Sequence, residues 1–145
     1  MIFSKACEYG IRATIYVAAQ SLEENRPNLK DISAEIESPE AFTAKILQML
    51  VKHKIINSIK GAMGGFEIDK KQLNKIRLED IVIAIDGGFS DKICVLGLKT
   101  CSQKHPCPVH DKYKYIKSDL ISMLQNTSLQ EMTSGLKEGL TCLKY

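Results

Sequence analysis

Three cysteines fall within fourteen residues in the stretch CVLGLKTCSQKHPCPVH, which runs from Cys94 to His110. No other stretch restricts the possible structure and function of the chain as much. It brings together one set of soft or borderline metal ligands, the thiols of Cys94, Cys101 and Cys107 and the imidazole of His110. Their spacing is wider than the two to four residues usual between the cysteines of a structural zinc site. Wide spacing suits an iron–sulfur cluster better, because its ligands surround several atoms. Three inert reduced thiols are the plain alternative.

The five cysteines of the 145-residue chain are an odd number, and no apolar run is long enough to span a membrane. We therefore expect a cytoplasmic protein whose cysteines are thiols or metal ligands, with Cys7 and Cys142 as packing residues. An apolar content of 44% is enough for a core. The net charge of +3 does not identify a nucleic-acid partner by itself. A basic cluster between residues 39 and 63 fits either phosphate contacts or a solvated helix face.

The first 76 residues predict a winged helix-turn-helix. Residues 4–21 have the periodicity of a buried helix, and Asn28 is placed to cap a second helix over 29–36. Ser38 and Pro39 predict the cap and first position of a third helix that runs to about His53. Its inner face would hold Phe42, Ile46, Leu47 and Leu50, and its outer face is predicted to hold Ala41, Thr43, Ala44, Lys45 and Gln48. Small and basic side chains on an outer face suit a recognition helix in the major groove.

Two short β-type runs, 55–60 and 66–68, flank the glycine-rich segment 61–65 and predict a hairpin. A hairpin directly after a recognition helix is a wing, whose Lys60 could hold a phosphate or enter a minor groove. Gly61 and Gly64 are expected to approach DNA with it. A phosphate-binding loop of nucleotide enzymes is disfavoured, because neither of its glycine signatures is present.

Residues 77–145 predict the cysteine loop and a dimerisation helix. A helix within 72–86 would stop at Gly87 and Gly88, and Pro106 and Pro108 would open a long helix to about 126. That helix carries a heptad seam, whose best partner is a second copy of the chain: Val109, Tyr113, Ile116, Leu120 and Met123. A last helix begins after Ser128, which makes a capping-box pattern with Glu131. The fold class is therefore mainly α with a small β-hairpin wing.

Several of these motifs together resemble the IscR/NsrR superfamily of winged-helix bacterial regulators. The resemblance rests on Glu8–Ala13, Phe42–Leu50, the wing Lys60–Phe66, Leu78–Ile81 and the three cysteines. It implies a homodimer with crossed long helices that binds a palindromic double-stranded DNA operator, and an iron–sulfur cluster, 2Fe–2S or 4Fe–4S. Many members bear an arginine where this chain has Lys60, and IscR has a glutamate where this chain has Ala44.

The resemblance also implies that Cys94, Cys101 and Cys107 are cluster ligands. In IscR-like members a histidine three residues after the last cysteine completes the site, and His110 matches it. In NsrR-like members an acidic residue before the Tyr-Gly pair of the first helix does so from the partner subunit, and Glu8 matches that. We favour His110, because its spacing to Cys107 ensures proximity in any dimer geometry. Zinc or a bare thiol switch is the alternative to a cluster. A thiol oxidoreductase is disfavoured, because neither a Cys-x-x-Cys pair nor a βαβ pattern is present.

Overall fold

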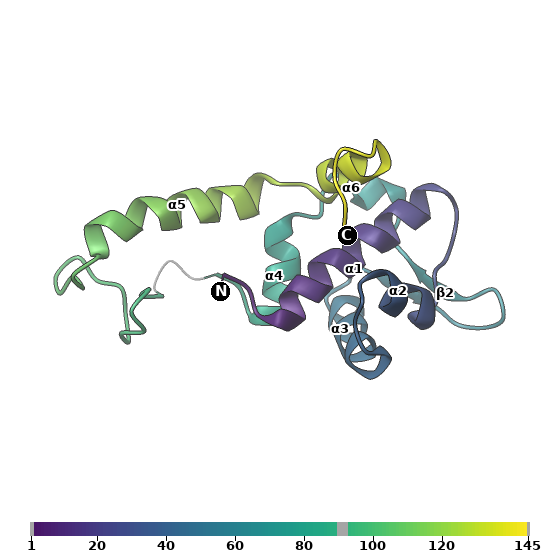
Figure 1. Cartoon of the computed structure of the whole chain (residues 1–145), viewed down its shortest axis with the longest axis horizontal. Helices are drawn as coiled ribbons and strands as arrows, with labels where there is room; N and C mark the ends of the chain where they lie inside the picture. Colours follow the sequence, from purple (N-terminus) through teal and green to yellow (C-terminus); the bar gives the residue numbers. More distant parts are fainter. Residues whose placement is uncertain (1, 90–92, 145) are drawn as a thin grey trace.

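The structure is a computed structural model that describes residues 2–89 and 93–144. The chain folds into a compact head and a projecting arm (Figure 1). The head contains α1 (Lys5–Leu22), α2 (Leu29–Glu35), α3 (Glu40–Lys52), α4 (Leu78–Asp86) and α6 (Leu129–Lys137). Strands β1 (Asn57–Ile59) and β2 (Gly65–Glu67) form the wing, and a 3-10 turn, Lys70–Gln72, follows it. The arm is α5 (His110–Asn126) with the cysteine loop folded along it.

Helix α1 is the centre of the head, because α3, α4 and α6 all pack against it. Its apolar stripe supplies Ala13, Ile15, Val17 and Ala18 to a core that also takes Ile46 from α3, Ile81 from α4 and Leu129 from α6. Gly10 lets α4 approach closely, since a Cβ there would lie 2.0 Å from Ile85 Cδ1. The predicted mainly helical fold with a small antiparallel hairpin is confirmed.

Two predicted caps are present. The Asn28 side chain accepts from the Asp31 N–H, and the Asp31 carboxylate accepts from the Asn28 N–H. The Ser128 hydroxyl accepts from the Glu131 N–H at 3.1 Å. Each cap satisfies N–H groups that a helix start leaves without a carbonyl partner.

Two predicted helix starts are displaced. Helix α3 begins at Glu40, with Pro39 as its cap, and Ser38 Oγ is buried without a hydrogen-bond partner among the described residues, so the predicted serine cap is wrong. Helix α5 begins at His110, with Val109 as its cap residue, so both prolines precede the helix. Helix α4, by contrast, lies within the predicted range 72–86, and Gly87 ends it as predicted.

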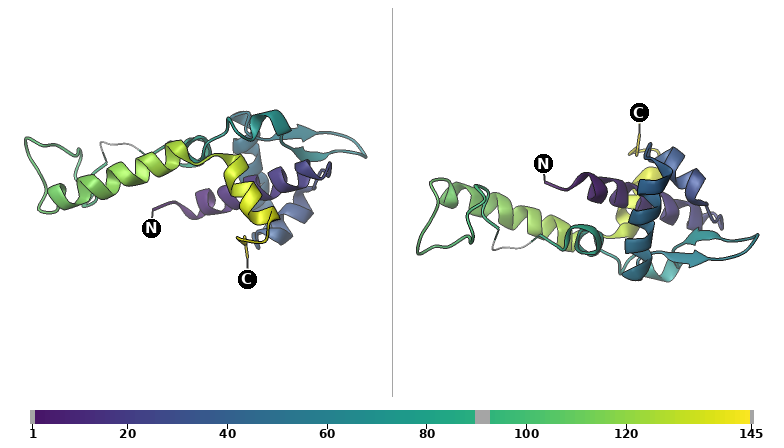
Figure 2. Two further views of the ribbon diagram at one scale, coloured as in Figure 1. Left: turned by 90° about the horizontal axis from the view of Figure 1, so that it is seen from above. Right: turned by 90° about the horizontal axis from the view of Figure 1, so that it is seen from below.

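The wing and the cysteine loop lie at opposite ends of the long axis in every view (Figures 1 and 2). Between them, α6 returns from the end of α5 and packs on α1. Head and arm are therefore linked at two places, the start of α6 and the α4–α5 contact. In the described part of the chain, none of the helices has the length and hydropathy needed to cross a membrane.

Candidate functional site

The exposed face of α3 carries most of the side chains predicted to contact DNA. Ala41, Lys45 and Gln48 are exposed and Ala44 is half-buried. Thr43 is not on this face: it is 0% exposed and donates its hydroxyl to the Pro39 carbonyl at 3.0 Å. Bonding to the carbonyl four residues earlier satisfies the hydroxyl inside the head, so the position of Thr43 on the outer face was predicted wrongly.

The wing directly follows this helix and exposes Lys60. Gly61 has φ +101, a left-handed conformation that favours glycine. Gly64 is needed for space, because a Cβ there would lie 2.2 Å from the Ile59 carbonyl oxygen. The glycines thus shape the tip of the hairpin that carries Lys60.

Phe42 lies at the edge of the recognition helix and not wholly in the core. It is 36% exposed, and its ring meets the Tyr9 ring edge-on with centroids 5.9 Å apart. Lys5 and Arg12 flank the same Tyr9 ring, at 5.2 and 4.8 Å from its centroid. The start of α3 is thereby held against α1.

In the cysteine loop, the candidate ligands lie close together in two pairs. Cys101 Sγ lies 3.4 Å from His110 Nδ1, and the Cys107 thiol is near enough to the buried Cys94 to affect its pKa. Backbone N–H groups of Leu96 and Leu98, followed by the Cys107 contact, lower the pKa of Cys94. Within residues 2–89 and 93–144, however, no three His, Cys, Asp or Glu side chains converge closely enough to hold a metal ion. The donor set fits a thiolate-bound centre in its chemistry and in its grouping on one loop.

Lys117 fastens this loop to α5, a role that the sequence did not indicate. Its side chain is buried, with 6% exposed, and its ammonium donates to the Ile93 carbonyl at 3.0 Å. Its charge also contributes to the lowered pKa of Cys94. Beside it, a cavity of about 340 Å³ is lined by Cys101, Gln103, His110, Lys114, Lys117, Ser118 and Ile121. The sequence alone would place Lys117 on the exposed face of a helix. The carbonyl that it contacts belongs to a loop residue 24 positions earlier, so no local pattern indicates the contact.

Glu8, the other candidate ligand, lies on α1 and pairs with Lys5 one turn earlier, at 3.0 Å. Its side chain is 36% exposed. Of the two candidates, only His110 is brought into contact with a loop cysteine among the described residues of one chain.

The start of α1 is fastened to the end of α4. The Asp86 carboxylate accepts from the Ser4 N–H at 3.0 Å and from the Ser4 hydroxyl, while that hydroxyl accepts from the Cys7 N–H at 3.1 Å. Burial and then the Asp86 charge raise the pKa of the Cys7 thiol to about 12. Cys7 is a packing residue as predicted, whereas Cys142 is exposed and the same prediction for it was wrong.

Residues 3–135 match a protein family, Rrf2, described as iron-dependent transcriptional regulators. The chain belongs to the Rrf2 family. The predicted resemblance to IscR-type winged-helix regulators is thereby confirmed, as is the expectation of a regulator in place of an enzyme.

Related proteins are similar in sequence to this chain over most of its length. A regulator of the helix-turn-helix type from Aquifex aeolicus is 28% identical over 134 residues, 91% of each chain. IscR of Photorhabdus laumondii is 24% identical over 127 residues, 88% of this chain and 76% of its own.

Among solved structures, CymR, the global cysteine regulator of B. subtilis, superposes with a TM-score of 0.75 at 20% identity, over 92% of this chain and 97% of its own. IscR of T. potens gives 0.72 at 19% identity, over 98% and 93%. These structures share the fold. A shared fold does not set the signal to which a regulator responds.

Proposed function

We propose that this Rrf2-family regulator is a homodimer that binds a two-part operator and whose affinity for it depends on an iron–sulfur cluster held by the arm. The observation that carries the proposal is the separation of a winged head from an arm that carries three thiols, an imidazole and a largely exposed apolar seam.

DNA binding is assigned to α3 and the wing. The side chains proposed to contact the operator are those of Ala41, Ala44, Lys45, Gln48 and Lys60, with Gly61 and Gly64 allowing close approach of the backbone. Lysine gives a point charge for a phosphate, while glutamine can reach a base edge. Two such heads related by a dimer axis require two half-sites.

Dimerisation is assigned to the arm. Among the described residues, eight of the thirteen exposed large apolar side chains lie between residues 93 and 123, which marks this face as one for a partner. Ile116 is 63% exposed and Met123 45%. Next to the seam, an apolar groove of about 630 Å³ runs between α4, the loop and α5. A second copy of α5, laid along the seam, would cover both.

The cluster is assigned to Cys94, Cys101, Cys107 and His110. When bound, it would supply an iron and sulfide centre that responds to oxidants or to iron supply. The chain's own residues hold the loop in place: Lys117 fastens the loop backbone and His110 begins α5, so the ligands lie against the helix proposed to dimerise. His110 is favoured as fourth ligand by its 3.4 Å contact with Cys101, and Glu8 from a second copy is the alternative.

A thiol switch is the second candidate, favoured by the lowered pKa of Cys94, to which the nearby Cys107 thiol contributes. Oxidation of this pair by hydrogen peroxide would join the two sulfurs and break the O–O bond, and the two electrons and two protons of the thiols would leave in two water molecules. Iron and sulfide analysis of anaerobically purified protein separates the candidates, because only the cluster contains both elements.

The DNA assignment is tested with a labelled duplex selected from a random pool by the full chain. Lys60→Ala should weaken binding and lower the salt slope by about one per head, if Lys60 holds a phosphate. Lys137→Ala is the matched control, since that exposed lysine lies on α6, across α1 from α3 (Figure 1). Binding that is indifferent to salt and sequence would refute the regulator's proposed interface.

The ligand assignment is tested with His110→Ala and Glu8→Ala, each reconstituted with iron and sulfide. We expect the first to change the visible spectrum and the operator affinity, and the second to leave both unchanged. The opposite pattern would assign the fourth ligand to Glu8.

A further inference from the structure

The wing is too small to hold its own position. Strands β1 and β2 pair only three residues each, and Met63 at the tip is 85% exposed. An isolated two-stranded hairpin is marginally stable at best in water. Something outside the hairpin must therefore fix its direction.

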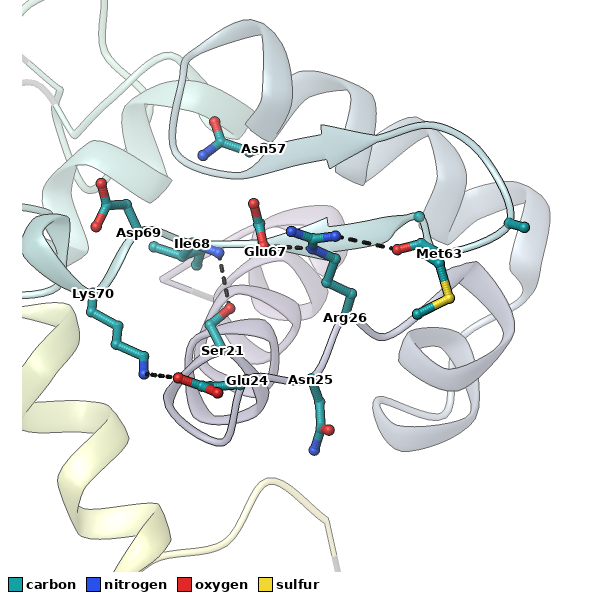
Figure 3. A pocket seen from close by; sticks show the side chains of 12 residues that line it. Ser21, Glu24, Asn25, Arg26, Asn57, Met63, Glu67, Ile68, Asp69 and Lys70 are labelled. Carbon is teal, nitrogen blue, oxygen red and sulfur yellow. Dashed lines mark hydrogen bonds and ion pairs between the residues drawn. The ribbon is translucent and has the colours of Figure 1, made fainter.

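Arg26, in the loop between α1 and α2, contacts the wing at two points (Figure 3). Its Nε donates to Glu67 Oε2 on β2 at 2.7 Å, and its Nη1 donates to the Met63 carbonyl at 3.3 Å. One planar guanidinium thus joins a strand and the tip that follows the other strand, a geometry that lysine's single ammonium does not reproduce.

Backbone contacts complete this attachment. The Phe66 N–H donates to the Pro27 carbonyl at 2.9 Å, and the Ile68 N–H donates to the buried Ser21 hydroxyl at 2.9 Å. Gly65 lies so close to the loop that a Cβ would be 2.7 Å from the Arg26 carbonyl oxygen. Strand β2 is therefore docked against the end of α1 and the loop after it.

The surroundings of Arg26 argue against a phosphate contact of its own. A cavity of about 680 Å³ beside it is lined by three carboxylates, Glu24, Glu67 and Asp69, against the cations Arg26 and Lys70. Glu67 already pairs with Arg26, and Glu24 pairs with Lys70 at 3.4 Å (Figure 3). This face does not offer the excess positive charge that binds a DNA backbone.

We infer that Arg26 is a positioning residue for DNA binding, which holds the wing so that Lys60 reaches the operator. Ile59 pairs with Gly65 across the hairpin, so Lys60 leaves the sheet opposite the segment that Arg26 and Pro27 hold. This inference rests on the proposed function of the wing. It assigns Arg26 a role that requires Glu67 and the Met63 carbonyl but no contact with DNA.

Charge exchange within the pair tests the inference. The variants are Arg26→Ala, Arg26→Glu, Glu67→Arg and the double variant R26E/E67R, measured by anisotropy on the selected duplex at several salt concentrations. Arg26→Ala should weaken binding by roughly fivefold or more, the usual range for coupled sites, with an unchanged salt slope. Arg26→Glu should weaken it further. The double variant should regain part of the affinity, because it restores the ion pair but not the bond from residue 26 to the Met63 carbonyl. Arg26→Lys should lie between wild type and Arg26→Ala.

Hydrogen exchange without DNA provides an independent measurement. In Arg26→Ala the amides of residues 60–67 should exchange faster, while those of α1 stay protected and the circular dichroism shows a folded head. Unchanged exchange together with unchanged affinity overturns the inference. A salt slope that falls as it does in Lys60→Ala, without rescue in R26E/E67R, also overturns it, because Arg26 would then contact a phosphate. If wild type fails to bind the duplex, the proposed function fails, and the exchange result still decides whether Arg26 holds the wing.

Discussion

The head and the arm differ in how much of their apolar surface one chain can cover. In the head, Ile32, Ile46 and Leu50 are 0% exposed and three helices enclose α1. In the arm, Leu124 at the base of α5 joins Cys7, Leu78 and Val82 in a small second core, and Leu120 packs against it. The seam side chains of Val109, Ile116 and Met123 are exposed, at 36%, 63% and 45%. A single chain therefore suffices to fold the head, whereas the arm needs a further surface to exclude water from its seam.

Backbone conformations show the same division. The non-glycine residues with positive φ are all in the head, at Glu24, Glu37 and Lys54, as far as residues 2–89 and 93–144 show. From Gly87 to Gly97, on the way into the arm, glycine fills the positive-φ positions that the structure describes. All three are exposed residues in the turns that end α1, α2 and α3, and each backbone N–H donates to a carbonyl three residues earlier. The hydrogen-bonded end of a packed helix can hold such a conformation, which the open loop leaves to glycine.

The sharpest test of this difference compares isoleucines from the two regions. Ile46→Ala should lower the free energy of unfolding by about 2–5 kcal/mol at every protein concentration, because it leaves a cavity in a closed core. Ile116→Ala should act only on the association of two copies, since the side chain is 63% exposed in one chain. Urea unfolding at two protein concentrations measures both. Equal, concentration-independent losses would break the comparison.

Within the head, thiol reactivity should follow burial. A pKa raised from 9.0 to about 12 leaves about a thousandfold less Cys7 thiolate at pH 8 than an unperturbed thiol. Because the folded-state pKa is raised, this thiol's contribution to stability is full below pH 9 and is lost as the pH approaches 12. Alkylation at pH 8, followed by mass spectrometry of tryptic peptides, should label the exposed Cys142 long before Cys7. Comparable rates would show that the head opens readily at α1.

A smaller effect is expected where α1 meets α4. Gly10→Ala should destabilise the head by about 1–3 kcal/mol, because the new Cβ would lie 2.0 Å from Ile85 Cδ1. Ile85→Val removes that methyl group, so the double variant should recover part of the loss, and thermal melts of the four proteins measure this coupling. Strictly additive losses would mean that the two residues do not meet.

The smallest expected effect is a gain. Lys54 follows α3 with φ +60, a conformation that glycine adopts without strain, so Lys54→Gly should stabilise the head by about 1 kcal/mol or less. Lys54→Ala keeps the strain and is the control. Equal stabilities of the two variants would show that the backbone there carries no strain.

The sequence predicted the features that depend on neighbouring residues alone. The periodicity of α1 and the caps at Asn28 and Ser128 give the helices, and the glycines between two β-type runs give the wing. The predicted boundary between residues 76 and 77 and the contacts with DNA, iron and a second copy stay predictions.

The errors arise where a contact between residues far apart in sequence determines the structure. The face of Thr43 depends on how α3 packs, and a threonine suits either side of a helix. Spacing placed His110 near Cys107, and the His110 N–H does donate to the Cys107 carbonyl at 3.0 Å. The sequence did not indicate that the irregular loop also brings Cys101 to the His110 ring. Arg26 was missed because its partner Glu67 is 41 residues away.

The central claim is that the arm is completed by a second copy of the chain. The mass of the full-length protein in solution, from sedimentation equilibrium, tests it most directly. We expect twice 16.2 kDa for the wild type, and 16.2 kDa with unchanged helical circular dichroism for the variant that combines Ile116→Asp and Leu120→Asp. A wild type of 16.2 kDa, or a double variant that keeps the doubled mass, would contradict the account.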